Sequence, residues 1–148
     1  MQQYLEDELK VPKSHIRKLH DAQATRAAII AEFVALATNP DITPNDPILI
    51  YYAGHGASCP PPLGWEAGGA DSKTQMLIPH DYHTTVDDDK VHGIPDRTLA
   101  ALITRIAKVK GDNIVRLLTR HKERSSNRAT DRHIRLLPLC LRHTHRHD

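Results

Sequence analysis

An unbroken apolar run, ILIYY at residues 48–52, constrains the fold of this chain more than any other feature. The run does not alternate with polar residues, which is typical of a strand buried on both faces of a parallel sheet. Gly54 follows the run and is expected to end the strand. We therefore predict a central parallel strand over residues 48–53, with His55 at its carboxyl end.

Helical and extended segments alternate around this strand. Apolar residues recur at helical spacing between Thr25, a suitable N-cap, and the Asn39-Pro40 pair, and again between Pro95 and Gly111. A shorter helix is expected over 1–10, short strands near residue 16 and over 75–79, and loops over 57–75 and 83–93. Alternating elements around a buried strand predict an α/β fold.

The charge of the chain changes abruptly after residue 114. Residues 1–114 hold 11 Lys or Arg and 15 Asp or Glu, a net charge of −4, whereas residues 115–148 hold 9 and 3, a net charge of +6. The second segment has 5 His but no Gly and no aromatic residue. Because it lacks aromatic side chains that stack on bases, no nucleic-acid partner is expected. We predict a folded domain over 1–114 and a basic, His-rich tail over 115–148 without regular structure.

His55 lies between Gly54 and Gly56, directly after the predicted central strand. Ligands of open α/β sheets bind beyond the carboxyl ends of the strands. The flanking glycines permit a tight turn and a close approach of substrate, and the N–H of Gly56 could donate to an oxyanion. A surface histidine in a turn explains the same residues equally well, so position alone leaves both roles of His55 open.

Three segments, ILIYYAGHGA, MLIPHDY and VHGIPDRTLAALI, closely resemble the caspase-like cysteine peptidases, and the metacaspase-like proteins of fungi in particular. The resemblance extends over roughly residues 1–114. It implies a three-layer α/β/α fold with a mostly parallel sheet, and cysteine-type endopeptidase activity through a Cys–His dyad. On this pattern His55 is the catalytic histidine, Gly56 an oxyanion-hole residue, and Asp81 a candidate for the substrate cleft, where it would accept a basic residue.

The chain departs from the family pattern at the nucleophile. The family places its catalytic cysteine on the strand after the last predicted helix, in a run such as Asp-Cys-Cys-His-Ser-Gly, whereas here VRLLTRHKERSSNR follows GDNI. The two cysteines of the chain, Cys59 and Cys140, lie outside that segment. The family's first core strand, expected before Met1, is missing as well. The resemblance therefore implies a fold truncated at both ends, without the first strand, the nucleophile strand or an identified nucleophile.

Two accounts of residues 115–148 stay open: they are the translation of another reading frame or of an intron, or the diverged tail of an inactive homologue. In either case we expect a caspase-like endopeptidase domain without activity. The alternative is a non-catalytic protein-interaction module that retains part of the fold. Cys59, four residues after His55, is interpreted as an exposed loop thiol, with a substitute nucleophile as the lesser alternative.

No metal site is expected. The histidines and aspartates between His80 and His92 match no zinc-ligand spacing, and a solvated acidic loop accounts for them. Only the family resemblance suggests a cofactor, which is calcium. The same resemblance implies a peptide or protein substrate as the partner. The apolar runs are too short to span a membrane, the acidic N-terminus does not read as a secretory signal, and two cysteines make no disulfide framework. A cytoplasmic location is therefore predicted.

Overall fold

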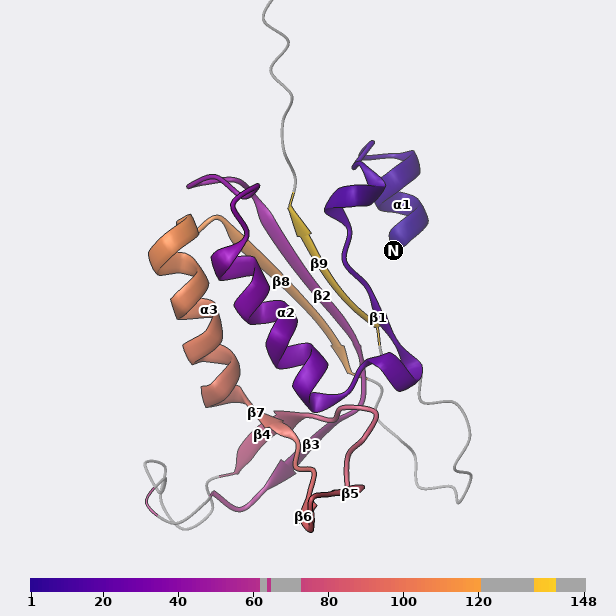
Figure 1. The fold of residues 1–148 in the computed structure, drawn as a ribbon, viewed down its shortest axis with the longest axis vertical. Coiled ribbons are helices and arrows are strands. Elements are labelled where there is room, and N and C mark those ends of the chain that lie inside the picture. Colours follow the sequence, from indigo (N-terminus) through magenta and orange to yellow (C-terminus); the bar gives the residue numbers. More distant parts are fainter. Residues whose placement is uncertain (62–63, 65–72, 121–134, 141–148) are drawn as a thin grey trace, which may run out of the picture.

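The predicted central strand, β2 (Ile48–Gly54), lies inside a four-stranded sheet with the order β1-β9-β2-β8. The computed structural model describes residues 1–61, 64, 73–120 and 135–140, and it pairs β2 in parallel with β8 (Ile114–Arg120). On its other side β2 pairs with β9 (Arg135–Cys140), which also pairs with β1 (Leu19–His20) (Figure 1). The central parallel strand is thus confirmed, and the protein has a mixed α/β fold.

The expectation of a mostly parallel sheet is wrong, because β9 runs antiparallel to both β2 and β1. The expectation that residues 115–148 lack regular structure is wrong for β8 and β9. A strand therefore does follow the last helix, although it carries no cysteine. Whether a segment becomes a strand depends on the strand it pairs with as well as on its own residues, so an argument from composition missed both strands. Residues 121–134 and 141–148, the rest of the expected tail, lie outside the described residues.

Pro138 lies within β9, although proline cannot donate to a ladder of hydrogen bonds. Strand β1 pairs only with Arg135 and Leu136, so at Pro138 the strand has β2 as its one paired neighbour. At Pro138 the strand β9 is therefore locally an edge strand, and edge strands tolerate proline.

Alternate side chains of β2 face two separate layers. Ile48, Ile50 and Tyr52 are at most 2% exposed and join the main core, which also includes buried residues of the two long helices. Leu49 and Tyr51 are half-buried and pack against a second cluster from the N-terminal segment, formed by Leu5, Val11 and Ile16. Both faces are therefore covered, which explains why the strand shows no alternation of apolar and polar residues.

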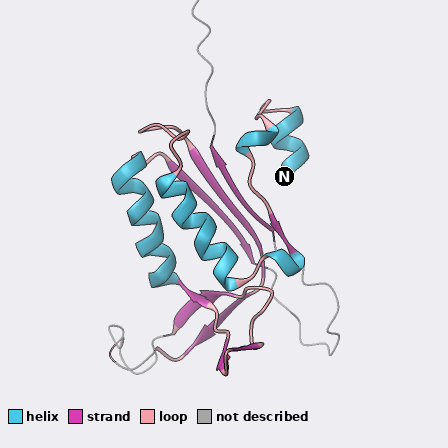
Figure 2. Cartoon of the chain, viewed as in Figure 1, coloured by secondary structure: helices cyan, strands magenta, loops and turns pink. Residues whose placement is uncertain are grey.

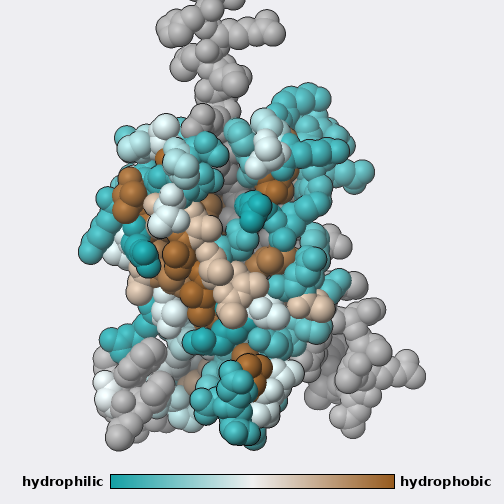
Figure 3. Space-filling view, in the orientation of Figure 1, coloured by the Kyte–Doolittle hydropathy of each residue, from teal (hydrophilic) through white to brown (hydrophobic). Residues whose placement is uncertain are grey.

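Helices α2 and α3 lie side by side on one face of the sheet (Figure 2). Helix α2 (Arg26–Thr38) begins after Thr25, whose Oγ1 accepts a hydrogen bond from the Ala28 N–H at 3.2 Å. Helix α3 (Asp96–Lys110) ends at Gly111, whose φ of +89° suits glycine. These boundaries agree with the sequence, and hydrophobic residues gather between the two helices (Figure 3).

The remaining elements are short. A three-stranded antiparallel sheet of order β3-β4-β7 lies beyond the carboxyl end of β2, and its first strand occupies residues expected to form a loop. Four polar or small residues, GASC, gave no strand signal in the sequence. The elements are α1 (Gln2–Asp7), 3-10 turns at Lys13–His15 and Asp21–Gln23, β3 (Gly56–Cys59), β4 (Thr74–Leu77), β5 (Thr85–Val86), β6 (Asp89–Lys90) and β7 (Ile94–Pro95).

Candidate functional site

His55 occupies the single position between β2 and β3, at the carboxyl end of the central strand. Its residue is half-buried, and its carbonyl accepts hydrogen bonds from the Ile78 N–H at 3.0 Å and from the Tyr52 hydroxyl at 2.8 Å. One donor from β2 and one from the residue that follows β4 therefore fix the backbone of His55. The position agrees with the sequence prediction, and the structure adds the groups that hold it.

Tyr52 is a part of this site that sequence reasoning missed. Its side chain is fully buried, and its hydroxyl lies 2.8 Å from the His55 carbonyl and 3.0 Å from the Ile78 carbonyl. Burial raises the pKa of the Tyr52 phenol to about 12, partly offset by the hydrogen bond to Ile78, so the hydroxyl keeps its proton and stays a donor at neutral pH. The signal was a tyrosine in a buried strand, because its hydroxyl needs a partner there.

We expect the substitution Tyr52→Phe to lower the free energy of unfolding by about 1 to 2 kcal/mol, because the buried Ile78 carbonyl loses its hydroxyl donor. Denaturant unfolding measured by circular dichroism checks this. The matched control is Tyr4→Phe, since Tyr4 is 55% exposed and should change little. Equal stability losses in the two variants would contradict the role given to Tyr52.

The raised pKa of Tyr52 also predicts a pH dependence. The folded protein holds this proton more tightly than the unfolded chain, whose pKa is near 10.0, so the stabilisation is complete below about pH 10 and lost as the pH rises towards 12. Unfolding curves between these pH values should therefore show a smaller loss of stability for Tyr52→Phe than for the unchanged protein.

The N–H of Gly56 is directed away from the neighbouring strand. Gly56 pairs with Leu77, and the preceding pair, His55 with Ile78, is joined by a hydrogen bond. Hydrogen-bonded and non-hydrogen-bonded pairs alternate along an antiparallel ladder, so Gly56 falls in a non-hydrogen-bonded pair. Strand β3 is the edge of its sheet, so this N–H points to the side of β3 that pairs with no described strand.

The carboxyl end of β8 lies beside that of β2, because Ala53 pairs with Thr119 and Gly54 with Arg120. Neither cysteine is near this point. Cys59 ends β3, four extended residues from His55, which corresponds to about 13 Å along the strand. Cys140 pairs with Ile48 at the opposite end of β2, about 20 Å from Gly54. Both separations are well beyond the reach of a thiol and an imidazole in a hydrogen-bonded dyad.

Asp81 stabilises the start of α2 rather than standing free. Its Oδ1 accepts a hydrogen bond from the Arg26 N–H at 2.8 Å, and the neighbouring His80 N–H donates to the Ala24 carbonyl at 2.9 Å. A carboxylate at this end of a helix satisfies an unpaired N–H and complements the helix dipole. Asp81 also lines a cavity of about 470 Å³, together with Arg26 and Lys90.

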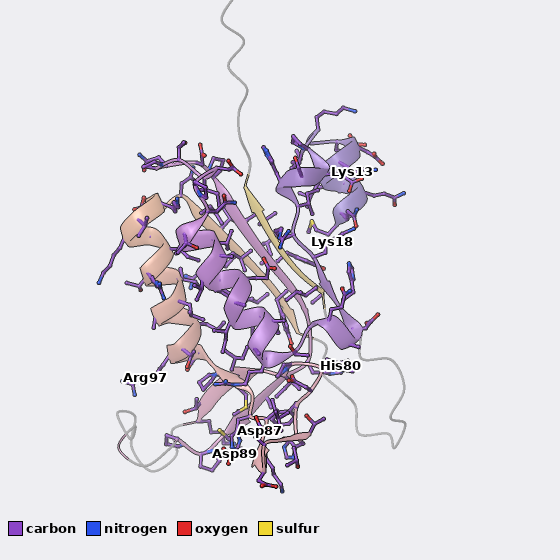
Figure 4. All side chains as sticks on the ribbon, viewed as in Figure 1. Lys13, Lys18, His80, Asp87, Asp89 and Arg97 are labelled. Atoms are coloured by element: carbon purple, nitrogen blue, oxygen red, sulfur yellow. The ribbon has the colours of Figure 1, made fainter. Side chains whose placement is uncertain are left out.

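The acidic segment after Asp81 forms the small β5–β6 hairpin, and Asp87 and Asp89 lie close to each other there (Figure 4). Within the described residues, no group of three or more His, Cys, Asp or Glu is arranged to hold a metal ion. Across the same part of the chain, no helix is long and apolar enough to cross a membrane.

Comparison of the chain with protein-family models, with curated proteins and with solved structures found no match.

Proposed function

We propose that this chain is a caspase-like cysteine-endopeptidase domain that retains the histidine and the oxyanion donor but lacks the nucleophile, and therefore does not cleave peptides. The single observation that carries the proposal is the position of His55. It follows the central strand directly, beside the Gly56 N–H and next to the carboxyl end of the parallel strand β8. Packing on both faces of β2 supports the three-layer arrangement.

The missing nucleophile decides the chemistry. Hydrolysis by this class needs a thiolate to attack the carbonyl carbon, a histidine to manage the proton and backbone donors to hold the developing negative charge. His55 and Gly56 supply the last two functions, whereas Cys59 and Cys140 are both held far from His55. The remaining groups can orient a carbonyl or a water molecule, which by itself gives a small part of the full acceleration.

We expect the purified chain to leave fluorogenic peptides that end in Arg or Lys uncleaved above the background of a His55→Ala control. A cysteine-reactive peptide probe should likewise label the protein no faster than it labels the Cys59→Ala variant. Turnover that disappears in Cys59→Ala or in Cys140→Ala would overturn the proposal, because one of these thiols would then be the nucleophile.

A non-catalytic interaction module is the second candidate, favoured by the surface of β8. This strand is the edge of the larger sheet, and Val115, Leu117 and Leu118 are 53%, 43% and 47% exposed. Exposed apolar edge strands pair readily with other chains. Binding of an uncleaved peptide that ends in Arg, followed by nuclear magnetic resonance at the Gly56 amide, discriminates between the two candidates, since an interaction module has no reason to bind a substrate peptide beside His55.

A further inference from the structure

A second cavity, of about 120 Å³, lies between α3 and the larger sheet, next to the edge strand β8. Most of its lining is apolar and comes from α2, α3, β2, β4 and β8. Four of the lining residues are exposed, so the cavity opens to solvent along β8; they are Asp96, Ala100, Arg116 and Leu118. Apolar cavities of about 150 Å³ stay free of water and bind a group as large as benzene, so this one suits a single apolar side chain.

The outer edge of β8 has no strand partner among the described residues. The Ile48 N–H donates to the Asn113 carbonyl at 2.9 Å, so Asn113 and the odd-numbered residues after it direct their main-chain groups towards β2. By this alternation the N–H and C=O groups of Arg116 and Leu118 point to the free edge. The side chains of the same two residues line the cavity, so hydrogen-bonding groups and a pocket occur together.

The charge of this edge is positive, in contrast to the chain before it. Residues 96–120, which comprise α3 and β8, hold 6 Lys or Arg and 2 Asp or Glu, a net charge of +4, whereas residues 1–95 hold 7 and 13, a net charge of −6. At the cavity, Arg116 has no ion-pair partner among the described residues, whereas the Asp96 carboxylate already accepts the Arg97 N–H at 2.7 Å. An acidic strand therefore complements this edge.

A second copy of the chain fits the edge less well. The strand β8 contains two arginines and no acidic residue, and like charges on paired strands are destabilising. A charged residue on an edge strand hinders unselective pairing, so Arg116 disfavours self-association and favours a partner of opposite charge.

We propose that β8 binds an extended acidic segment of a partner protein as an additional strand, with one apolar side chain of that segment in the cavity beneath α3. Peptides that extend a sheet gain affinity from main-chain hydrogen bonds and specificity from pockets for alternate side chains. The proposal rests on the interaction-module function, the second candidate above, and it names the chemistry of the partner.

Titration of the full, isotopically labelled chain with the acetylated and amidated peptide Thr-Glu-Val-Leu-Val-Glu-Thr tests the proposal by nuclear magnetic resonance. In an extended peptide the leucine and both glutamates share one face, so the leucine can enter the cavity with a glutamate beside Arg116 in either strand direction. The amides of Arg116 and Leu118 should shift and saturate, and their hydrogen exchange should slow. The matched peptide with lysine in place of both glutamates should bind at least about tenfold more weakly.

Two pairs of variants test the cavity and the charge. Ala100→Leu should fill the cavity from α3 and weaken binding at least about tenfold, because the leucine of the peptide is no longer buried. Its control is Ala101→Leu, at the next exposed position of the helix and outside the cavity. Both changes exchange strong helix formers, so the fold is kept. Arg116→Glu should reverse the preference between the two peptides, whereas Arg105→Glu, exposed in α3 outside the cavity, should not.

Equal binding of the glutamate and lysine peptides at β8, or equal effects of Ala100→Leu and Ala101→Leu, would overturn the partner chemistry while leaving an interaction strand. No saturating shift at Arg116 and Leu118 with either peptide would remove the interaction function as well. Saturating shifts at Gly56 alone would place the peptide beside His55 and overturn the proposal in favour of the endopeptidase-like function. Protection of the β8 amides that grows with the concentration of the chain alone would overturn it by assigning the edge to a second copy.

Discussion

Replacing Ile106 by alanine is expected to lower the free energy of unfolding by about 3 to 4 kcal/mol. Ile106 lies in α3, is fully buried and belongs to the main core beneath the two long helices. Removing its side chain takes away the burial free energy of the lost carbon atoms and leaves a cavity that the rigid helix–sheet contact cannot close fully. Denaturant unfolding followed by circular dichroism measures the loss.

The matched control for Ile106→Ala is Val109→Ala, three residues further along the same helix. Val109 is 54% exposed, so its truncation should change the free energy of unfolding by no more than about 0.5 kcal/mol. Similar effects of the two substitutions would show that α3 does not pack on the sheet through the face that contains Ile106.

Local features of the fold were predictable from the sequence. The run ILIYY predicted the strand β2. In the same way Thr25 predicted the start of α2, and Gly111 predicted the end of α3. Each of these signals comes from neighbouring residues of the chain. The helix periodicity predicted one apolar face of α3, formed by Leu99, Leu102, Ile103, Ile106 and Val109. Leu99 and Ile106 are buried as expected, whereas Val109 is 54% exposed, so the prediction is wrong for the last turn. In each case the physical cause, a hydrogen bond or a hydrophobic stripe, lies within a few residues.

Contacts between distant segments were not predictable in the same way. The Arg26 N–H and Asp81 lie 55 residues apart, and β9 pairs with β2 although Pro138 interrupts its apolar cluster. Strand β3 is four small or polar residues that become extended because β4 pairs with them. Such features depend on which segments meet in space, and a single sequence contains no direct record of that.

In the candidate site too, local features were predictable and contacts between distant segments were not. The position of His55 followed from one strand and one glycine, whereas the hydroxyl of Tyr52 reaches a carbonyl 26 residues away. The placement of Cys59 and Cys140 relative to His55 also required the pairing of strands, because the sequence alone does not give the distance between distant segments. The sequence shows only that the family's cysteine motif is missing. The strand pairing shows in addition that both cysteines lie too far from His55 to form a dyad with it.

Lys110 makes a further contact between distant segments. It lies in the last turn of α3, where a positive charge favours the end of that helix. In the structure Lys110 is only 8% exposed, and its Nζ donates to the carbonyls of Asn39 and Ile42 at 2.7 and 2.8 Å. Asn39 is the C-cap of α2, so one lysine donates to two carbonyls at and beyond the end of the neighbouring helix.

We expect Lys110→Met to lower the free energy of unfolding by about 2 to 3 kcal/mol, because two carbonyls lose a charged donor while the volume of the side chain is nearly kept. Lys108→Met is the control, since Lys108 is exposed in the same last turn of α3 and contributes chiefly through the helix dipole, about 0.5 kcal/mol. Lys110 joins the end of α3 to the segment that leads from α2 into β2, and the Asn45 N–H bonds its carbonyl at 2.7 Å. Loss of the two Nζ hydrogen bonds should therefore also speed hydrogen exchange of the β2 amides in Lys110→Met, but not in Lys108→Met. Equal stability and equal exchange in the two variants would show that Lys110 does not connect the two helices.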